Sequence, residues 1–100
     1  EEFIEIVESS GQKLLVFDLY ADWCGPCKSL SPILEKIAIE SKDNVGFYKI
    51  DVDQHRQLAN SLRVKGIPYV VFIKNKRVVY TLTGLHPKGT YLGVIKRYLE

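Results

Sequence analysis

The hydrophobic and polar positions in the first half of the chain predict a helix, a strand and a longer helix. Residues 3–9 have the spacing of a short amphipathic helix, which should end near Gly11. The nearly continuous apolar run at residues 14–20 is typical of a strand that is covered on both faces. From Pro26 to Ser41 the apolar positions recur at i, i+3, i+4 and i+7, as in a helix: Leu30, Ile33, Leu34 and Ile37.

The second half continues with strands and helices of ordinary length. Val45–Val52 should be a strand, and Gln54–Leu62 a short helix. Tyr69–Ile73 and Arg77–Leu82 are two strand-like runs close enough to form an antiparallel hairpin. The last helix should extend from Pro87 to Leu99, with three apolar residues on one face: Leu92, Ile95 and Leu99.

This order of elements, α-β-α-β-α-β-β-α, predicts an α/β fold. Its alternating part implies parallel strands joined by right-handed helical crossovers. The final hairpin should add an antiparallel edge, and helices should cover both faces of the sheet. The hairpin turn, Asn75-Lys76, lacks the usual Asn-Gly pair, so its geometry stays open.

Composition narrows the class of protein. The chain has 100 residues, a length that suits one domain. Of these residues 46% are hydrophobic and 26% are charged, as in an ordinary globular protein. The net charge of +2 does not suggest a nucleic-acid binder. No apolar run approaches the roughly 20 residues that a membrane span needs. The chain has no Met and begins with Glu1, so we expect a processed or trimmed N-terminus, which leaves a lost targeting segment open.

The two cysteines, Cys24 and Cys27, point to redox chemistry. A disulfide that closes so short a loop adds little stability, so the pair is better explained by reactivity. Cys24 follows the first strand at the start of a helix, where free N–H groups and the helix dipole stabilise a thiolate. We therefore expect Cys24 to be the nucleophile and Cys27 to be the resolving thiol. Gly25 would let a partner approach, Pro26 would stiffen the turn, and Trp23 would offer an apolar surface.

The cysteine pair could also have a role without redox chemistry. It could be half of a zinc site, for which His55 and His86 are the candidate partners, far apart in sequence. It could also be two inert core cysteines. The position at a strand-to-helix junction favours the redox interpretation and no metal site.

Several motifs together resemble the thioredoxin family across nearly the whole chain. Trp23–Lys28 (WCGPCK) is similar to the active-site motif of that family. The other matching segments are Leu15–Asp18 before the motif, Pro32–Leu34 in a kinked helix, Asp51–Asp53, the cis-proline loop Gly66–Pro68 and Gly84. Tyr20 stands where many members have a second tryptophan, which could alter local packing.

The resemblance implies the thioredoxin fold: a mixed β-sheet of four to five strands with helices on both faces. It implies one domain over residues 1–100, whose N-terminal strand is trimmed or absent. It further implies reduction of disulfides in protein substrates by a redox-active Cys24–Cys27 disulfide, with no tightly bound cofactor. An NADPH-dependent flavoprotein thioredoxin reductase would restore the dithiol. The protein would be a cytoplasmic monomer, or extracytoplasmic if an export signal has been removed.

The resemblance also assigns roles around the dithiol. Asp18 would lie beneath it as the acid/base for Cys27, because burial raises the pKa of a carboxyl group; the alternative is a strand-end aspartate. Lys49 would tune Asp18, or be a solvated strand lysine. A cis peptide bond before Pro68 would turn the Ile67 backbone toward Cys24 for pairing with substrate.

Three further residues complete the predicted site. Asp53 could accept a hydrogen bond from the indole of Trp23, cap the next helix, or do both. Gly84 and Leu85 should flank the dithiol, although Gly84 could be an ordinary turn glycine.

Two rival functions remain. A thioredoxin-fold oxidase or isomerase would use the same cysteines, but such relatives usually carry a histidine where this chain has Gly25-Pro26. A binding module would keep the fold without catalysis.

Overall fold

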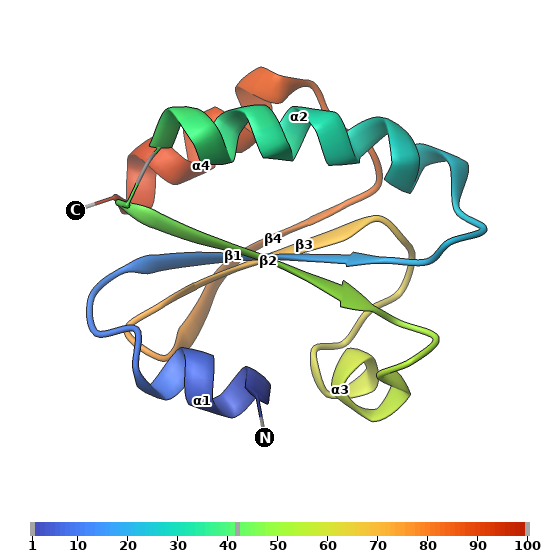
Figure 1. Ribbon diagram of the computed structural model, residues 1–100, viewed down its shortest axis with the longest axis horizontal. Coiled ribbons are helices and arrows are strands. Elements are labelled where there is room, and N and C mark those ends of the chain that lie inside the picture. The colour runs from blue at the N-terminus through green and yellow to red at the C-terminus, as the bar shows by residue number, and fades with distance from the viewer. Residues whose placement is uncertain (1, 42, 100) are drawn as a thin grey trace.

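A mixed sheet of four strands lies between two layers of helices in the structure, a computed structural model that describes residues 2–41 and 43–99 (Figure 1). The elements are α1 (Glu2–Glu8), β1 (Leu14–Tyr20), α2 (Gly25–Ser41), β2 (Val45–Asp51), α3 (Arg56–Ser61), β3 (Tyr69–Lys74), β4 (Arg77–Thr83) and α4 (Lys88–Tyr98). Every predicted helix and strand is present, and their order is confirmed.

The strand order in the sheet is β2-β1-β3-β4. β1 and β2 are parallel and are joined by α2, whereas β3 is antiparallel to both β1 and β4. Two of the three strand pairings are therefore antiparallel, whereas the sequence predicted an antiparallel pairing only in the final hairpin. The alternation of helices and strands does not fix the direction of the strand that follows α3, and this explains the difference.

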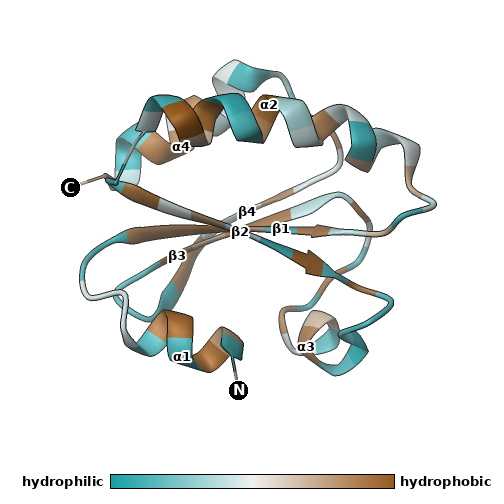
Figure 2. Cartoon of the chain, in the orientation of Figure 1, coloured by the Kyte–Doolittle hydropathy of each residue, from teal (hydrophilic) through white to brown (hydrophobic). Residues whose placement is uncertain are grey.

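The strand β1 lies in the middle of the sheet and separates two hydrophobic clusters. Its residues Leu14 and Val16 face the layer that contains α2 and α4, while Leu15, Phe17 and Leu19 face the layer of α1 and α3. In Figure 2 the strands are largely brown, and the helices alternate between brown and teal. This burial explains why the sequence of β1 is nearly continuously apolar, and each such side chain contributes roughly 1.5–3 kcal/mol.

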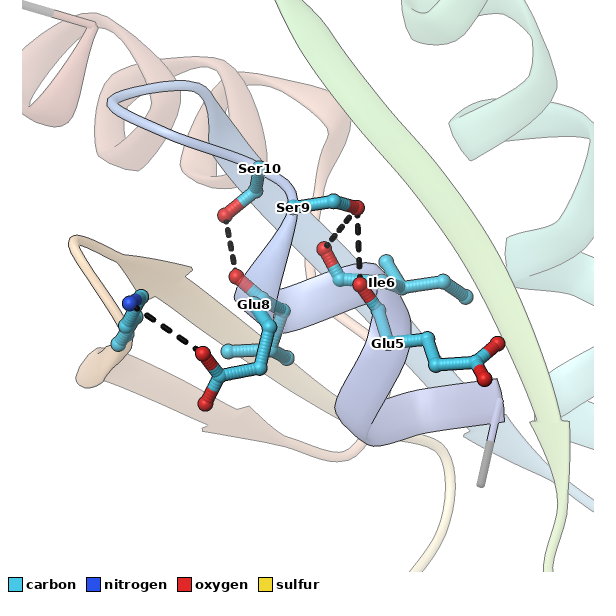
Figure 3. Close-up of polar contacts among 7 residues, drawn as sticks. Glu5, Ile6, Glu8, Ser9 and Ser10 are labelled. Carbon is cyan, nitrogen blue, oxygen red and sulfur yellow. Dashed lines mark hydrogen bonds and ion pairs between the residues drawn. The ribbon is translucent and has the colours of Figure 1, made fainter.

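The hairpin turn between β3 and β4 uses two residues with positive φ. Asn75 has a φ of 53° and Lys76 a φ of 67°, as in a type I′ turn. The geometry that the sequence left open is thus the usual hairpin geometry, although Lys76 replaces the glycine that suits it best. Lys76 also forms an exposed ion pair with Glu8, at an Nζ–Oε1 distance of 3.3 Å, which links the turn to α1 (Figure 3).

Two serine hydroxyls occupy the end of α1. Ser9 donates a hydrogen bond to the carbonyl oxygen of Glu5 and Ser10 donates one to that of Val7, each at 2.8 Å (Figure 3). The same two carbonyl oxygens also accept hydrogen bonds from the backbone N–H groups of Ser9 and Ser10, so each hydroxyl adds a second bond at the end of the helix. Gly11 follows with a φ of 61°, as expected where a helix ends.

The apolar face of α4 differs from the prediction. Its buried residues are Tyr91, Val94 and Ile95, whereas Leu99 lies beyond the helix and is exposed. Of the three predicted residues, Ile95 is buried and Leu92 packs against the core, so only Leu99 was placed wrongly, and Tyr91 and Val94 are buried residues that the sequence pattern did not include. In the ranges 2–41 and 43–99, no helix combines the length and apolarity that crossing a membrane requires.

Candidate active site

The cysteine pair lies where the chain leaves β1 and turns back into α2. Cys24 and Cys27 are joined by a disulfide, with their Cα atoms 5.3 Å apart. The backbone N–H of Cys27 donates a hydrogen bond of 3.2 Å to Sγ of Cys24. The first turn of a helix therefore points a donor at Cys24, which stabilises negative charge on this sulfur when the disulfide is reduced.

The cis-proline loop packs against the cysteine pair, and the loop before β3 and the loop after β4 lie at the same end of the sheet as the start of α2 (Figure 1). The peptide bond between Ile67 and Pro68 is cis, as the family resemblance implied. Ile67 packs against the cluster that Cys24 and Cys27 form. The N–H of Gly84 donates a hydrogen bond of 2.7 Å to the carbonyl oxygen of Pro68, so the two loops are tied together.

The backbone conformation at position 84 favours glycine. Its φ of +85° lies in the left-handed region, yet a Cβ added there would meet no atom within 4 Å. A side chain at this position would thus be disfavoured by the backbone rather than by lack of space. Leu85 follows and is exposed, as is Trp23, which has 70% of its surface accessible. The side chains of Trp23 and Leu85 are therefore apolar groups that are accessible to solvent.

Trp23 is fixed by a contact with the segment that follows β2. Its indole Nε1 donates a hydrogen bond of 2.9 Å to Oδ2 of Asp53. Asp53 does not cap α3, because the N-cap residue of that helix is His55, which makes no side-chain capping bond. Of the two interpretations of Asp53, the structure contains only the pairing with Trp23.

Asp18 is a buried carboxyl on the face of β1 that is covered by α2. It is 3% exposed, and within the described part of the chain its Oδ1 has no hydrogen-bond partner. Desolvation raises the pKa of Asp18 from 3.8 to about 6, and the charge of Lys49 opposes this rise. Asp18 borders a cavity of about 200 Å³ that Ser31 and Lys49 also line, and these two residues line a second cavity with Cys27.

Lys49 is the register partner of Asp18 on β2, but the two charges do not form an ion pair. Its Nζ instead donates a hydrogen bond of 3.3 Å to Oγ of Ser31 and lies 4.5 Å from the centre of the Tyr20 ring. The influence of Lys49 on Asp18 is therefore exerted through space. Neither Ser31 nor Tyr20 was expected to contact Lys49 from the sequence.

The alternative of a zinc site has no support in the geometry. Both cysteines form the disulfide, and among the described residues no three His, Cys, Asp or Glu side chains come together as a metal site would require. His86 uses its ring nitrogen Nε2 in a 2.9 Å hydrogen bond with the carbonyl group of Thr83.

The comparisons with known proteins agree with this geometry. The thioredoxin family model matches residues 1–97. This chain belongs to the thioredoxin family. The pair Cys24–Cys27 is thus a thioredoxin redox pair, and the chain is a thiol-disulfide oxidoreductase that carries out dithiol–disulfide exchange. Membership also implies disulfide-containing substrates and a reductase that restores the dithiol.

Three thioredoxins illustrate the similarity. Thioredoxin of Malassezia sympodialis is 42% identical over 80 residues, which cover 79% of this chain and 76% of the relative. Thioredoxin-2 of Saccharomyces cerevisiae is 40% identical over 79 residues, which cover 79% of this chain and 75% of the relative. The X-ray structure of Fasciola hepatica thioredoxin matches with a TM-score of 0.92 at 32% identity, covering 97% of this chain and 91% of that one. The predicted thioredoxin fold is confirmed.

Tyr91 supports the site and was not predicted from the sequence. It is fully buried in α4, and its hydroxyl accepts a hydrogen bond of 3.2 Å from the N–H of His86 and donates one of 3.4 Å to the carbonyl oxygen of Gly84. Burial raises the pKa of Tyr91. A buried tyrosine hydroxyl usually has a polar partner, so a tyrosine among the apolar residues of the last helix was the available signal.

Proposed function

We propose that this thioredoxin-family chain works as a protein-disulfide reductase. The Cys24 thiolate attacks one sulfur of a substrate disulfide, which forms a mixed disulfide and releases the other substrate sulfur as a thiolate. Cys27 then attacks Sγ of Cys24 and releases the second substrate thiolate. Two electrons pass to the substrate, and the Cys24–Cys27 disulfide remains. The observation that carries the proposal is the placement of Cys24 at the start of α2, with a backbone N–H directed at its sulfur.

Asp18 is proposed as the acid/base for Cys27, with Lys49 adjusting its affinity for protons. A pKa of about 6 would leave Asp18 largely ionised at neutral pH and able to accept the proton of the Cys27 thiol. Its unpartnered Oδ1 supports this role, because that atom is available to a proton or a water molecule.

Substrate is proposed to dock across the exposed rim around the disulfide. Trp23, Gly25 and Pro26 would contact it on one side, and Gly84 and Leu85 on the other. Ile67 and Pro68 would receive an extended segment of the substrate in the manner of an added strand. In support, neither the N–H nor the C=O of Ile67 takes part in a backbone hydrogen bond among the described residues.

The proposed setting follows from this activity. An NADPH-dependent flavoprotein thioredoxin reductase would return the disulfide to the dithiol, and a reducing enzyme of this kind suits the cytoplasm. Residues 1–100 would act as one monomeric domain. Nucleic acid is not a proposed partner, since the net charge is only +2.

Reduction of insulin disulfides with dithiothreitol as the electron donor tests the chemistry. Cys24→Ser should abolish catalysis, whereas Cys27→Ser should accumulate a mixed disulfide that mass spectrometry detects as protein plus substrate. Activity of Cys24→Ser equal to that of the wild type would exclude dithiol catalysis and leave a binding module. Equilibration with glutathione tests the direction: a couple more oxidising than glutathione would favour the oxidase or isomerase.

The role of Asp18 has its own test. Asp18→Asn should fold and should reduce insulin more slowly near neutral pH, by about 100-fold or more, because the resolving thiol loses its base. Equal rates for the variant and the wild type across pH 6–9 would contradict this role and leave the role of the cysteines intact.

A further inference from the structure

A short chain of polar groups holds the ammonium group of Lys49. Lys49 Nζ donates to Oγ of Ser31 at 3.3 Å, and the Ser31 hydroxyl lies 3.4 Å from Oε2 of Glu35, to which it donates. A hydroxyl group can accept one bond while it donates another, so both contacts form together. The ring of Tyr20, with its centre 4.5 Å from Nζ, contacts the same ammonium group.

The same ammonium group lies near a carboxyl that has no ion-pair partner. Lys49 and Asp18 are opposite each other in the parallel pair of β2 and β1. Both residues line one cavity, together with Ser31 and Glu35. Asp18 is nevertheless without an ion pair among the described residues, and its Oδ1 is buried and unbonded.

We propose that Ser31 and Tyr20 are positioning residues, which hold the Lys49 ammonium group at the mouth of the Asp18 cavity and so keep the Asp18 carboxyl unpaired. The consequence for disulfide exchange rests on the role of Asp18 proposed above. Ser31 comes one helical turn after Cys27 and lines both cavities, the one that Asp18 borders and the one that Cys27 borders.

The expected effect follows from the charges around Asp18. An ammonium group in contact with a carboxylate lowers the pKa of that carboxylate by about 1–3 units. The other ionisable groups near Asp18 are a carboxyl and three tyrosines on four elements: Glu35 of α2, Tyr48 of β2, Tyr20 of β1 and Tyr91 of α4. They would oppose its ionisation if charged, and its neighbour on β3, Val70, carries no charge. Lys49 is therefore the group whose movement can lower the pKa of Asp18.

The test is a titration of the Asp18 carboxyl by carbon NMR in the oxidised protein, where no turnover is needed. In Ser31→Ala the ammonium group loses its acceptor and can approach Asp18, so the pKa of Asp18 should fall by about one unit. Ser31→Thr keeps the hydroxyl and should restore the wild-type titration. Ser29→Ala is the matched control, because Ser29 is an exposed serine of the same helix.

A double-mutant cycle separates an action through Lys49 from a direct effect of Ser31. In a Lys49→Met background, Ser31→Ala should no longer shift the titration of Asp18. An unchanged titration in the single variant would overturn the proposal, and so would a shift that persists without Lys49.

The pH dependence of insulin reduction tests the consequence separately. Its midpoint should move in Ser31→Ala to lower pH by the same amount as the NMR titration. A shifted titration with an unmoved turnover profile would support the positioning role and instead refute Asp18 as the acid/base.

Discussion

Trp23 and Asp53 are joined by a hydrogen bond of 2.9 Å that connects the active-site loop to the segment after β2. Asp53 is itself oriented, because its backbone N–H donates a 2.9 Å hydrogen bond to Oδ1 of Asp51. The exposed indole is thereby fixed at one end while its apolar face remains open to a partner. Such an arrangement preserves a binding surface without the entropy cost of ordering it when substrate arrives.

Removal of the acceptor should loosen this indole. In Asp53→Ala we expect the KM for insulin to rise severalfold with little change in kcat, since a hydrogen bond of this kind contributes about 1 kcal/mol. Trp23 is the single tryptophan of the chain, so its fluorescence anisotropy reports the change directly and should fall. Asp53→Asn retains a carbonyl acceptor and is the control. Unchanged anisotropy in Asp53→Ala would show that other contacts fix the indole.

Asp18 should make the stability of the oxidised protein depend on pH. Its folded-state pKa of about 6 lies above the ordinary aspartate value of 3.8, so folding binds a proton between these values. The contribution of Asp18 to stability is therefore fully present below about pH 4 and is lost as the pH rises through about 6. The full shift corresponds to about 3 kcal/mol, as each unit of pKa is equivalent to about 1.4 kcal/mol.

The variant Asp18→Asn removes this dependence. Since the new amide group also lacks a partner, we expect it to be more stable than the wild type by about 1–3 kcal/mol at pH 8, and by much less at pH 4. Urea unfolding of both oxidised proteins at the two pH values measures the difference. If the two proteins differed in free energy of unfolding by the same amount at pH 8 and at pH 4, ionisation of Asp18 would not destabilise the folded protein, and this prediction would be wrong.

Much of the fold could be predicted because its elements carry clear periodic patterns. The apolar run of β1 and the i, i+3, i+4 spacing of α2 both predicted real elements with nearly correct ends. The direction of β3 could not be predicted, because it depends on packing between segments far apart in sequence. The buried face of α4 was predicted only in part, because Tyr91 packs in the core while its hydroxyl forms hydrogen bonds that the sequence pattern does not indicate.

The candidate site likewise has features that the sequence could predict and features that it could not. The cysteine pair and its helix start are local features, so the sequence was sufficient to locate them. The contact of Lys49 with Ser31 joins β2 to α2, and no local pattern indicates it. The family resemblance supplied the position of Lys49 but not the residue that holds its ammonium group, because a side-chain contact of this kind depends on the particular residues of one chain.

Gly84 and Gly93 should respond in opposite directions to replacement by alanine. Gly84→Ala places a side chain at a φ of +85° and should destabilise the protein by roughly 1–2 kcal/mol and raise the KM for insulin. Gly93 lies inside α4 without a positive φ and with open space around its Cβ position. Gly93→Ala should therefore stabilise the protein by about 0.5–1 kcal/mol. Urea unfolding measures both, and a neutral Gly84→Ala would show that this loop can change its backbone conformation freely.

Tyr91 should affect substrate binding although it is fully buried. Tyr91→Phe removes the acceptor for the His86 N–H and the donor to the Gly84 carbonyl oxygen, at a cost of about 1–2 kcal/mol in the free energy of unfolding. The segment that contains Leu85 would then be held less firmly beside the disulfide. We therefore expect the KM for insulin to rise while kcat stays within about twofold of the wild type, because the cysteines and Asp18 are untouched.

The matched control is Tyr80→Phe, which removes a hydroxyl from a partly exposed tyrosine of β4 that makes no side-chain hydrogen bond among the described residues. Its unfolding free energy and KM should stay near those of the wild type. Should Tyr91→Phe lower the free energy of unfolding and leave KM unchanged, the loop of Gly84 and Leu85 would be held by its bond to Pro68 alone, since the 2.7 Å contact between Gly84 N–H and the Pro68 carbonyl does not depend on the tyrosine. A rise in KM without loss of stability would instead mean that the two hydroxyl bonds mainly orient the docking surface.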